Sequence, residues 1–400
     1  MQKITVIGDI MVEPPFMEQV SKDGKYDFIP SLMPLKALLE ESDYVIGNLE
    51  TPLAGEEAKY TYRIVSFNAP DSLVDALKAI GVDAVSTCNN HSLDRGYEGL
   101  ARTIDVLDQA GVAHTGTYKK DHKGDRILYF TVGDTKYALI AYTYATNYGI
   151  NGVCTEGLGC VNMFRPQCNA PGLYKPLPKP YFDTLNYIES LLGRKMIWEE
   201  TIKLKIAMHY PVPVIDNLVP EEELEAYFKL IAADYAEARK NADIVLFYPH
   251  AGGQFNEEPG LYTQLLVKKS AQLGFDGIFA AHSHTSQRAE ILDGKPCFYS
   301  MGNVTMSPGT FYSVSECLPE YGLAAHLYVD DKKIQKVTFS IFKMVEEGDE
   351  PLHVVPVDQL YETWTGEKRR TLWEQVASVY HRVTGKELAQ GPLRREYDLG

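Results

Sequence analysis

The first 147 residues alternate short apolar runs with helical stretches, and this alternation constrains the fold more than any other feature of the sequence. Residues 3–7, 44–46 and 84–86 have the length and composition of buried strands. The expected helices are 32–41, 71–80 and 102–111. Strands that alternate with helices at this pitch form βαβ units, which build a largely parallel sheet. We therefore predict an α/β fold of layered, parallel-rich sheets flanked by helices.

A hairpin and an interruption follow this first stretch. Residues 126–132 and 136–143 are separated by Gly133-Asp134-Thr135, and we expect them to form a hairpin added to the first sheet. Residues 148–202 contain many glycines and prolines, which break long elements, so we predict an insertion with one helix near 181–192. Long ordered insertions near the rim of a site are often functional, and we expect this one to cap the site.

The strand–helix pattern resumes after the insertion. Sheet-like segments are expected at 204–208, 244–248 and 278–281, with helices between them. We predict one domain at 1–344 that contains the insertion. The charged residues 345–400 are expected to form a mainly helical C-terminal extension.

The charge balance restricts the partners. The chain has 39 basic and 54 acidic residues, a formal net charge of −15, whereas nonspecific binding to nucleic acid or anionic lipid requires a basic face. No run of eighteen apolar residues occurs, and Met1 leads directly into the first strand, so we expect neither a membrane span nor a signal peptide. The sequence as written therefore predicts a cytoplasmic protein.

The cysteines do not form a metal-binding pattern. Cys154, Cys160 and Cys168 cluster, but none of the six cysteines belongs to a C-x-x-C pair. Structural zinc sites usually contain such close pairs. We therefore expect free thiols.

Five separate apolar runs end in a residue that can bind a metal. In chain order these ends hold Asp9, Asn48 with Glu50, Asn90 with His91, His250, and His282 with His284. The intervals from Asp9 to Glu50 and from Glu50 to Asn90 each suffice for one strand–helix–strand unit. Because functional groups gather beyond the carboxyl ends of parallel strands, we expect these side chains to converge at one rim.

The donor set points to a particular metal chemistry. Carboxylates and imidazoles suit divalent Mn, Fe or Zn, and a carboxylate can bridge two ions. Two ions roughly 3.5–4 Å apart stabilise the attacking and leaving oxygens of an in-line displacement and generate hydroxide near neutral pH. We predict a dinuclear site for two divalent metal ions.

The ordered motifs resemble a known family. The sequence contains GDIM, GNLETPLAG, FNAP, NNHSLDRGYEGLARTIDVLDQAGVAHTG, AYTYATN, PHAGGQF and AAHSHTSQRAEILDGKPCFYSMGN between residues 4 and 303. This set resembles the calcineurin-like metallophosphoesterases and, more closely, the bacterial capsule-synthesis proteins of the CapA or poly-γ-glutamate biosynthesis type.

The resemblance implies roles for the ligands. Asp9 and His284 would bind the first metal, Glu50 would bridge with Asn48 as the alternative in the same turn, and Asn90, His250 and His282 would bind the second metal. Two positions depart from the pattern. Met11 replaces the histidine of the usual Asp-x-His, and Ala-Gly-Gly-Gln-Phe follows His250 where the family more often has an aromatic and an acidic residue.

The resemblance also implies a general acid for the reaction. His91, next to Asn90, would protonate the leaving group or hold the oxyanion of the substrate. Asp94 has two interpretations: it orients His91, or it is the N-cap of the helix that follows.

Other strand ends also carry polar residues that are candidates for the site. Asn147 ends the AYTYATN strand and can line a pocket, Tyr142 and Tyr144 can shape its wall, and His209 lies at another strand end. Asn303, after Gly302, is expected to be a turn residue.

Together these features predict a metal-dependent hydrolase. A two-metal-activated hydroxide would attack a small anionic or phosphorylated substrate. The resemblance also implies a γ-glutamyl polymer as substrate, with the metals acting on an amide or a phosphorylated intermediate. The alternative is a non-catalytic or weakly catalytic capsule-biosynthesis subunit that binds an anionic polymer or a partner protein, and Met11 is its main support.

Overall fold

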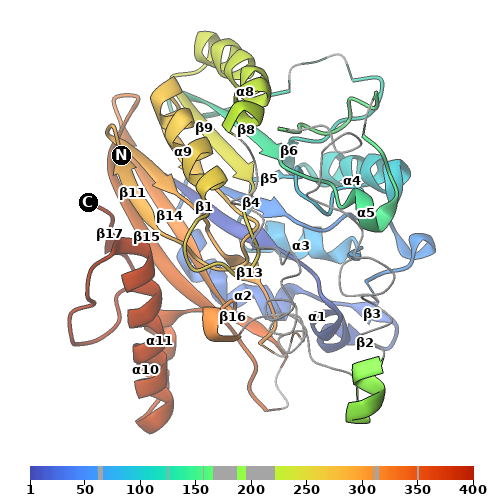
Figure 1. The fold of residues 1–400 in the computed structure, drawn as a ribbon. Coiled ribbons are helices and arrows are strands. Elements are labelled where there is room, and N and C mark those ends of the chain that lie inside the picture. Colours follow the sequence, from blue (N-terminus) through green and yellow to red (C-terminus); the bar gives the residue numbers. More distant parts are fainter. Residues whose placement is uncertain are drawn as a thin grey trace.

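The computed structural model contains two β-sheets that enclose a common core, with helices outside them (Figure 1). It describes residues 1–61, 66–122, 124, 126–155, 157–164, 187–194, 221–308, 310, 315–348 and 351–400.

The first sheet is mixed. Its strands lie in the order β16 (His353–Pro356), β15 (Lys333–Val345), β14 (Tyr321–Asp330), β1 (Gln2–Ile10), β4 (Tyr44–Leu49), β5 (Ala84–Ser86) and β6 (Ala113–Thr115). β13 (Asn303–Thr305) also pairs with β1, and β17 (Tyr397–Asp398) with β15. The β1–β4–β5–β6 half and β13 are parallel, whereas β14, β15 and β16 add antiparallel pairs.

The second sheet has a parallel centre. Its order is β11 (Ala289–Leu292), β12 (Lys295–Phe298), β10 (Gly277–Phe279), β9 (Ile244–His250), β8 (Thr135–Thr143) and β7 (Leu128–Val132). β12, β10, β9 and β8 are parallel, and antiparallel strands close both edges.

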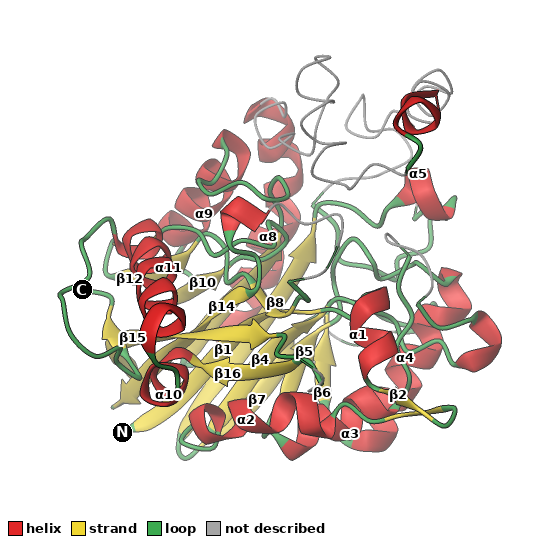
Figure 2. Ribbon diagram, turned by 90° about the horizontal axis from the view of Figure 1, so that it is seen from below, coloured by secondary structure: helices red, strands yellow, loops and turns green. Residues whose placement is uncertain are grey.

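The helices lie on both outer faces, except that α11 packs its buried valines into the core between the sheets. They are α1 (Pro14–Gln19), α2 (Ile29–Leu39), α3 (Ser72–Ala79), α4 (Gly96–Ala110), α5 (Tyr148–Asn151), α8 (Glu221–Asn241), α9 (Leu261–Leu273), α10 (Val357–Thr363) and α11 (Gly366–Thr384). The other described elements are two short strands, β2 (Ser21–Lys22) and β3 (Lys25–Tyr26), two 3-10 turns at Glu56–Ala58 and Ser315–Cys317, and the helical residues 187–192. In Figure 2 the strands lie between two groups of helices, with α8 and α9 on one side and α2 and α3 on the other.

Alternate side chains of each central strand enter different cores. In β8, Leu139 and Ala141 pack between the two sheets, whereas Ile140 and Tyr142 pack on the outer side. Residues on both faces of a covered parallel strand are apolar, which explains its continuous hydrophobic sequence. The predicted fold class, layered α/β with parallel-rich sheets flanked by helices, is confirmed.

The structure corrects the position of the predicted hairpin. β7 and β8 do form a hairpin, but it belongs to the second sheet, because β8 pairs with β9 rather than with a strand of the first sheet. β9 comes about a hundred residues later in the chain, and a pairing over that separation leaves no trace in a local pattern.

β1 is longer than predicted and carries Asp9 into the sheet. A Cβ atom at Gly8 would lie 2.0 Å from the carbonyl oxygen of Gly302, so only glycine allows this approach. The Asp9 backbone N–H then donates to the Gly302 oxygen at 2.9 Å. The Gly-Asp pair is therefore part of the strand.

Much of the predicted insertion, with the expected strand at 204–208 and His209, lies outside the described residues. Of the expected helix at 181–192, residues 187–192 are described and helical. Phe164, within the predicted insertion, is fully buried in the outer core of the second sheet. The capping role of 148–202 stays a prediction.

Residues 351–400 are built into the first sheet. The helices α10 and α11 supply the expected helical content, and Figure 1 shows them in red beside β15 and β17. β16 and β17 from the same segment both pair with β15.

The expectation of free thiols is wrong for Cys154. Cys154 is in a disulfide, whereas Cys88, Cys160, Cys297 and Cys317 are buried free thiols. Whether two cysteines come within bonding distance depends on tertiary geometry, which sequence spacing does not show. No helix among the described residues is long and apolar enough to cross a membrane.

A buried histidine in β14 should make the fold sensitive to acid. His326 contacts Thr5 Oγ1 at 2.8 Å and Ser340 Oγ at 2.9 Å, and burial lowers its pKa from 6.5 to about 3. The unfolded chain therefore binds a proton that the folded chain excludes, so stability falls as the pH drops below 6.5 towards 3. Between pH 6.5 and pH 5, the free energy of unfolding of His326→Gln should therefore fall by about 2 kcal/mol less than that of wild type.

The measurement is urea unfolding of both proteins at pH 7 and pH 5. His381→Gln is the control, because the His381 side chain is 57% exposed. An equal pH dependence in wild type and His326→Gln would refute the prediction.

Candidate metal centre

Strands from both sheets end at one edge of the sandwich and bring the candidate ligands together. The first sheet supplies Asp9 on β1, Glu50 after β4, and Asn90 and His91 after β5. The second sheet supplies His250 at the end of β9 and both His282 and His284 after β10. All seven side chains are buried, with exposed fractions from 0% to 3%.

The first donor group combines Asp9, Glu50 and His284. One ligand atom from each lies within 4.8 Å of the other two. His284 Nδ1 is 3.4 Å from Asp9 Oδ2, and His284 Nε2 is 3.7 Å from Glu50 Oε1. Met11 is not a member of this group, which therefore has three protein donors.

The second donor group combines Glu50, His250 and His282 within the same 4.8 Å limit. His250 Nε2 is 3.4 Å from Glu50 Oε1 and 3.2 Å from His282 Nδ1. Asn90 Oδ1 lies 2.7 Å from the same nitrogen. Asn90 thus adds a fourth oxygen or nitrogen donor next to this group, and Glu50 belongs to both groups.

The chemistry of Glu50 fits a bridging metal ligand. Within the part of the chain that the structure describes, neither of its buried carboxylate oxygens has a hydrogen-bond partner. Burial, followed by the neighbouring Asp9 carboxylate, raises the pKa of Glu50 well above its usual range. A buried carboxyl group without donors is costly, and divalent cations would supply the missing partners.

The ionisation of the other ligands fits the same role. Burial lowers the pKa of His250 to about 3 and that of His282 well below its usual value, so both imidazoles are neutral, the form that binds metals. Burial alone would raise the pKa of Asp9, but the hydrogen bond with His284 is the largest of the effects that bring it below its usual value.

Two side chains outside the donor groups fix the imidazole orientations. Asn303 donates through Nδ2 to the carbonyl oxygens of His284 and Pro319, so its Oδ1, 2.9 Å from His284 Nδ1, accepts from that ring. The hydroxyl of Tyr144 is 2.8 Å from His282 Nε2. Such partners select which ring nitrogen faces a metal. Asn303 begins the strand β13, so the expectation of a turn residue is wrong.

Asn48 is engaged in orienting Asp9. Its Nδ2 donates to Asp9 Oδ1 at 2.7 Å, and its Oδ1 accepts from Asn89 Nδ2 at 3.2 Å. With both ends of the amide occupied, Glu50 fits the bridging position better than Asn48 does.

The backbone of the His-x-His segment is strained. His282 has φ 105° and His284 has φ 55°, both in the region that favours glycine. Non-glycine residues stay in this region only where the surroundings hold them, and such sites are commonly functional.

His91 and Asp94 form a buried pair beside the second donor group. His91 Nδ1 is 2.6 Å from Asp94 Oδ2, which also accepts from the Phe67 backbone N–H at 2.7 Å. The N-cap of α4 is Arg95, so the capping interpretation of Asp94 is wrong and the orienting one agrees with the contacts. With Nδ1–H donated to Asp94, His91 Nε2 is free to carry or accept a proton.

Asn147 joins this pair to the metal centre. Its Oδ1 accepts from Asn90 Nδ2 at 3.3 Å, and its Nδ2 lies 3.4 Å from His91 Nδ1. Tyr142 points the other way, because its hydroxyl donates to Asp234 on α8 at 2.7 Å. Of the two tyrosines considered for a pocket wall, only Tyr144 reaches the site.

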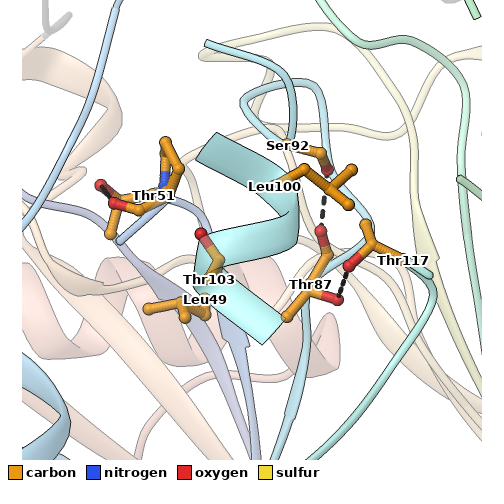
Figure 3. A pocket seen from close by; sticks show the side chains of 8 residues that line it. Leu49, Thr51, Thr87, Ser92, Leu100, Thr103 and Thr117 are labelled. Atoms are coloured by element: carbon orange, nitrogen blue, oxygen red, sulfur yellow. Dashed lines mark hydrogen bonds between the residues drawn. The ribbon is translucent and has the colours of Figure 1, made fainter. Parts of the chain in front are cut away.

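A small cavity lies behind the loop that carries Asn90 and His91 (Figure 3). Its volume is about 10 Å³, and its lining includes Leu49, Thr87, Ser92 and Thr117. Thr87 and Thr117 bond through their hydroxyls at 2.6 Å, and Ser92 Oγ donates to the Thr87 carbonyl at 2.8 Å. A cavity of this size holds about one water, so it supports the loop and is not a substrate pocket.

Comparison with known proteins identifies the family. The family model described as "Bacterial capsule synthesis protein PGA_cap" matches residues 3–307. The chain belongs to this family. Every residue of the two donor groups lies within the part of this PGA_cap chain that the model matches.

Named relatives agree with this assignment. The chain is 25% identical over 329 residues to the uncharacterized protein y4sH of Sinorhizobium fredii, covering 75% of this chain and 65% of that protein. It is 22% identical to the PGA biosynthesis protein CapA of Bacillus subtilis, covering 79% and 66%, and 22% identical to the capsule biosynthesis protein CapA of Bacillus anthracis, covering 80% and 63%. The PGA_cap chain thus spans just under two thirds of the length of these relatives.

Two solved structures are similar to the PGA_cap chain. A hypothetical protein from Thermus thermophilus matches with a TM-score of 0.39 at 14% identity, covering 89% of this chain and 98% of that one. The 5'-nucleotidase from Candida albicans matches with a TM-score of 0.39 at 11% identity, covering 94% and 58%.

Proposed function

We propose that this chain is a metal-dependent hydrolase of phosphoester-type bonds that works within the chemistry of its capsule-synthesis family. The main support is Glu50, a buried carboxylate without hydrogen-bond donors among the described residues, shared by two groups of metal-binding side chains. Asp9, Glu50 and His284 would hold one divalent ion, and Glu50, Asn90, His250 and His282 the other. Mn, Fe and Zn suit this donor set.

The protein residues have separate tasks in this proposal. A bound pair of divalent ions supplies an activated water and positive charge for the developing anion. Asn90 belongs to the second donor group and His91 lies next to it in the chain, and both would contact a substrate oxyanion. His91 Nε2, with Nδ1 held by Asp94, would deliver a proton to the leaving oxygen.

The proposal is tested by metal analysis combined with an activity screen. Purified wild type should contain about two ions per chain, and His282→Ala fewer, because His282 belongs to the second group. The loaded protein should hydrolyse some members of a panel of phosphomonoesters and phosphodiesters. If the metal-loaded protein hydrolyses no member of the panel, the proposal that it is a hydrolase of phosphoester-type bonds is wrong.

The two ions should bind with unequal affinity. The second group has four protein donors, with Asn90 included, whereas the first has three. Calorimetric titration of metal-free protein with Mn²⁺ should therefore show two phases, and Asn90→Ala should weaken the tighter one by about 10- to 100-fold. A single phase of two equivalent ions would contradict this assignment.

A second candidate function is a non-catalytic or weakly catalytic subunit that binds an anionic γ-glutamyl polymer or a partner protein. The first donor group favours it, because Met11 is not a metal-binding side chain of that group and leaves it with three protein donors. Metal-dependent binding of poly-γ-glutamate without cleavage of either polymer or phosphoesters would establish this alternative.

The compartment is a separate question. A cytoplasmic location is expected from the sequence, but disulfides such as that of Cys154 are rare in the reducing cytoplasm. Alkylation of the native protein in cell extracts decides between the two. Labelled Cys154 indicates a reducing compartment, and protected Cys154 an oxidising one.

A further inference from the structure

A charged side chain from the C-terminal helix is buried against the loops that follow two candidate metal ligands. Arg382 lies in the last turn of α11 and is 8% exposed, next to the apolar residues Val379 and Val383 of the core between the sheets. Arginine is almost never buried at this level without partners.

The partners of Arg382 lie on three different loops. Nη1 donates to the carbonyl oxygen of Cys317 at 2.9 Å and lies 3.5 Å from that of Ser286, and Nη2 pairs with Glu257. Ser286 is two residues after His284, and Glu257 is in the loop that follows His250. One guanidinium group therefore ties α11 to the loops that continue from two candidate ligands.

These loops are also joined to one another by hydrogen bonds. The Phe255 backbone N–H donates to the Ser283 oxygen at 2.6 Å, and the Gln287 side chain donates to the Asn256 oxygen at 2.7 Å. The Cys317 thiol donates to the Phe255 oxygen at 3.2 Å. Phe255, like His282 and His284, has a positive φ, 54°. The strained backbone of the His-x-His segment is therefore held by contacts in which Arg382 takes part.

We propose that Arg382 is a positioning residue for the metal centre, fixing the loops of His250 and His284 from a helix outside the family-matched residues 3–307. This proposal rests on the proposed metal centre. It makes the C-terminal helix, through one side chain, a determinant of metal affinity.

The test compares three variants of the full chain. Arg382→Met removes all three contacts and should weaken Mn²⁺ binding by about 10- to 100-fold, as loss of an outer-shell partner does. Glu257→Gln should have a smaller effect, because Glu257 is 54% exposed and its ion pair is screened by solvent. Arg370→Met on the same helix is the matched control: Arg370 is 69% exposed and should leave affinity unchanged.

Hydrogen exchange of the metal-free proteins gives a second, independent readout. Arg382→Met should raise exchange in residues 251–258 and 282–287 but not in β1 or β8. Wild-type metal affinity together with wild-type exchange in these loops would overturn the proposal, as would a uniform rise over the whole fold, which indicates a general loss of stability.

Two further outcomes are decisive. If Arg382→Met does not fold, Arg382→Lys keeps the charge but cannot span the same three acceptors, and wild-type affinity in that variant overturns the proposal. If wild type binds no metal, the proposed function fails, whereas the exchange comparison on the metal-free chain still decides the role of Arg382.

Discussion

Glu50→Gln should lose both metal ions at once, whereas replacing any other candidate ligand should affect mainly one. Glu50 is the one described side chain shared by both donor groups, and a neutral amide cannot bridge two cations as a carboxylate does. Metal content by elemental analysis should fall from about two ions per chain to well below one. The exposed Glu57→Gln is the control and should retain wild-type metal content.

The same substitution should stabilise the metal-free protein. Glu50 has no hydrogen-bond donor among the described residues, and the Asp9 carboxylate beside it raises its pKa. A glutamine amide can donate to Asp9, so metal-free Glu50→Gln should be more stable than metal-free wild type by about 1–3 kcal/mol. Thermal unfolding with and without Mn²⁺ measures both effects. If Glu50→Gln keeps two ions, or if its metal-free form is less stable, the bridging assignment is wrong.

His91→Gln should lower turnover by about 10²- to 10⁴-fold, the usual contribution of a general acid, without changing metal content. The reason is geometric: Asp94 holds His91 Nδ1 at 2.6 Å, which leaves Nε2 to protonate the leaving oxygen. The loss should be large for esters of alkyl alcohols and small for esters of nitrophenol, whose leaving group needs no proton. Asp94→Asn should act in the same direction, because it removes the acceptor that holds the ring.

A second histidine–aspartate pair provides the control. His114 Nε2, on the edge strand β6, lies 3.1 Å from Asp108 Oδ1, and His114→Gln should leave turnover unchanged. Equal losses for alkyl and nitrophenyl esters would show that His91 binds the oxyanion and is not the acid. Loss of bound metal in His91→Gln would contradict both roles of His91, as the general acid and as an oxyanion-binding residue.

The sequence predicted the candidate ligands because each is a local feature. A polar residue at the end of an apolar run is visible without tertiary information, as with His250 after β9 and Glu50 after β4. The rule that carboxyl ends of parallel strands share one edge then places them together. The assignment to donor groups came from family resemblance, and the distances around Glu50 and His250 agree with it.

The partners of those ligands could not be predicted in the same way. Asn303 and Arg382 act through contacts with His284 and with the loop at Ser286, and the chain positions that they join are far apart. A Gly-Asn pair is typical of a turn whether or not its amide meets an imidazole. The prediction that the β7–β8 hairpin belongs to the first sheet was wrong for the same reason, because the pairing of β8 with β9 decides which sheet the hairpin joins.

The order of strands in the first sheet has a consequence for biosynthesis. β1 lies in the middle of that sheet, with β4 on one side and β14 on the other. A ribosome that adds about 5–20 residues per second needs on the order of 15–60 s to make the roughly 300 residues between β1 and β14. During this interval the nascent chain exposes one full edge of an apolar strand, a surface prone to aggregation. Chaperone capture of partly synthesised chains is therefore expected during this interval.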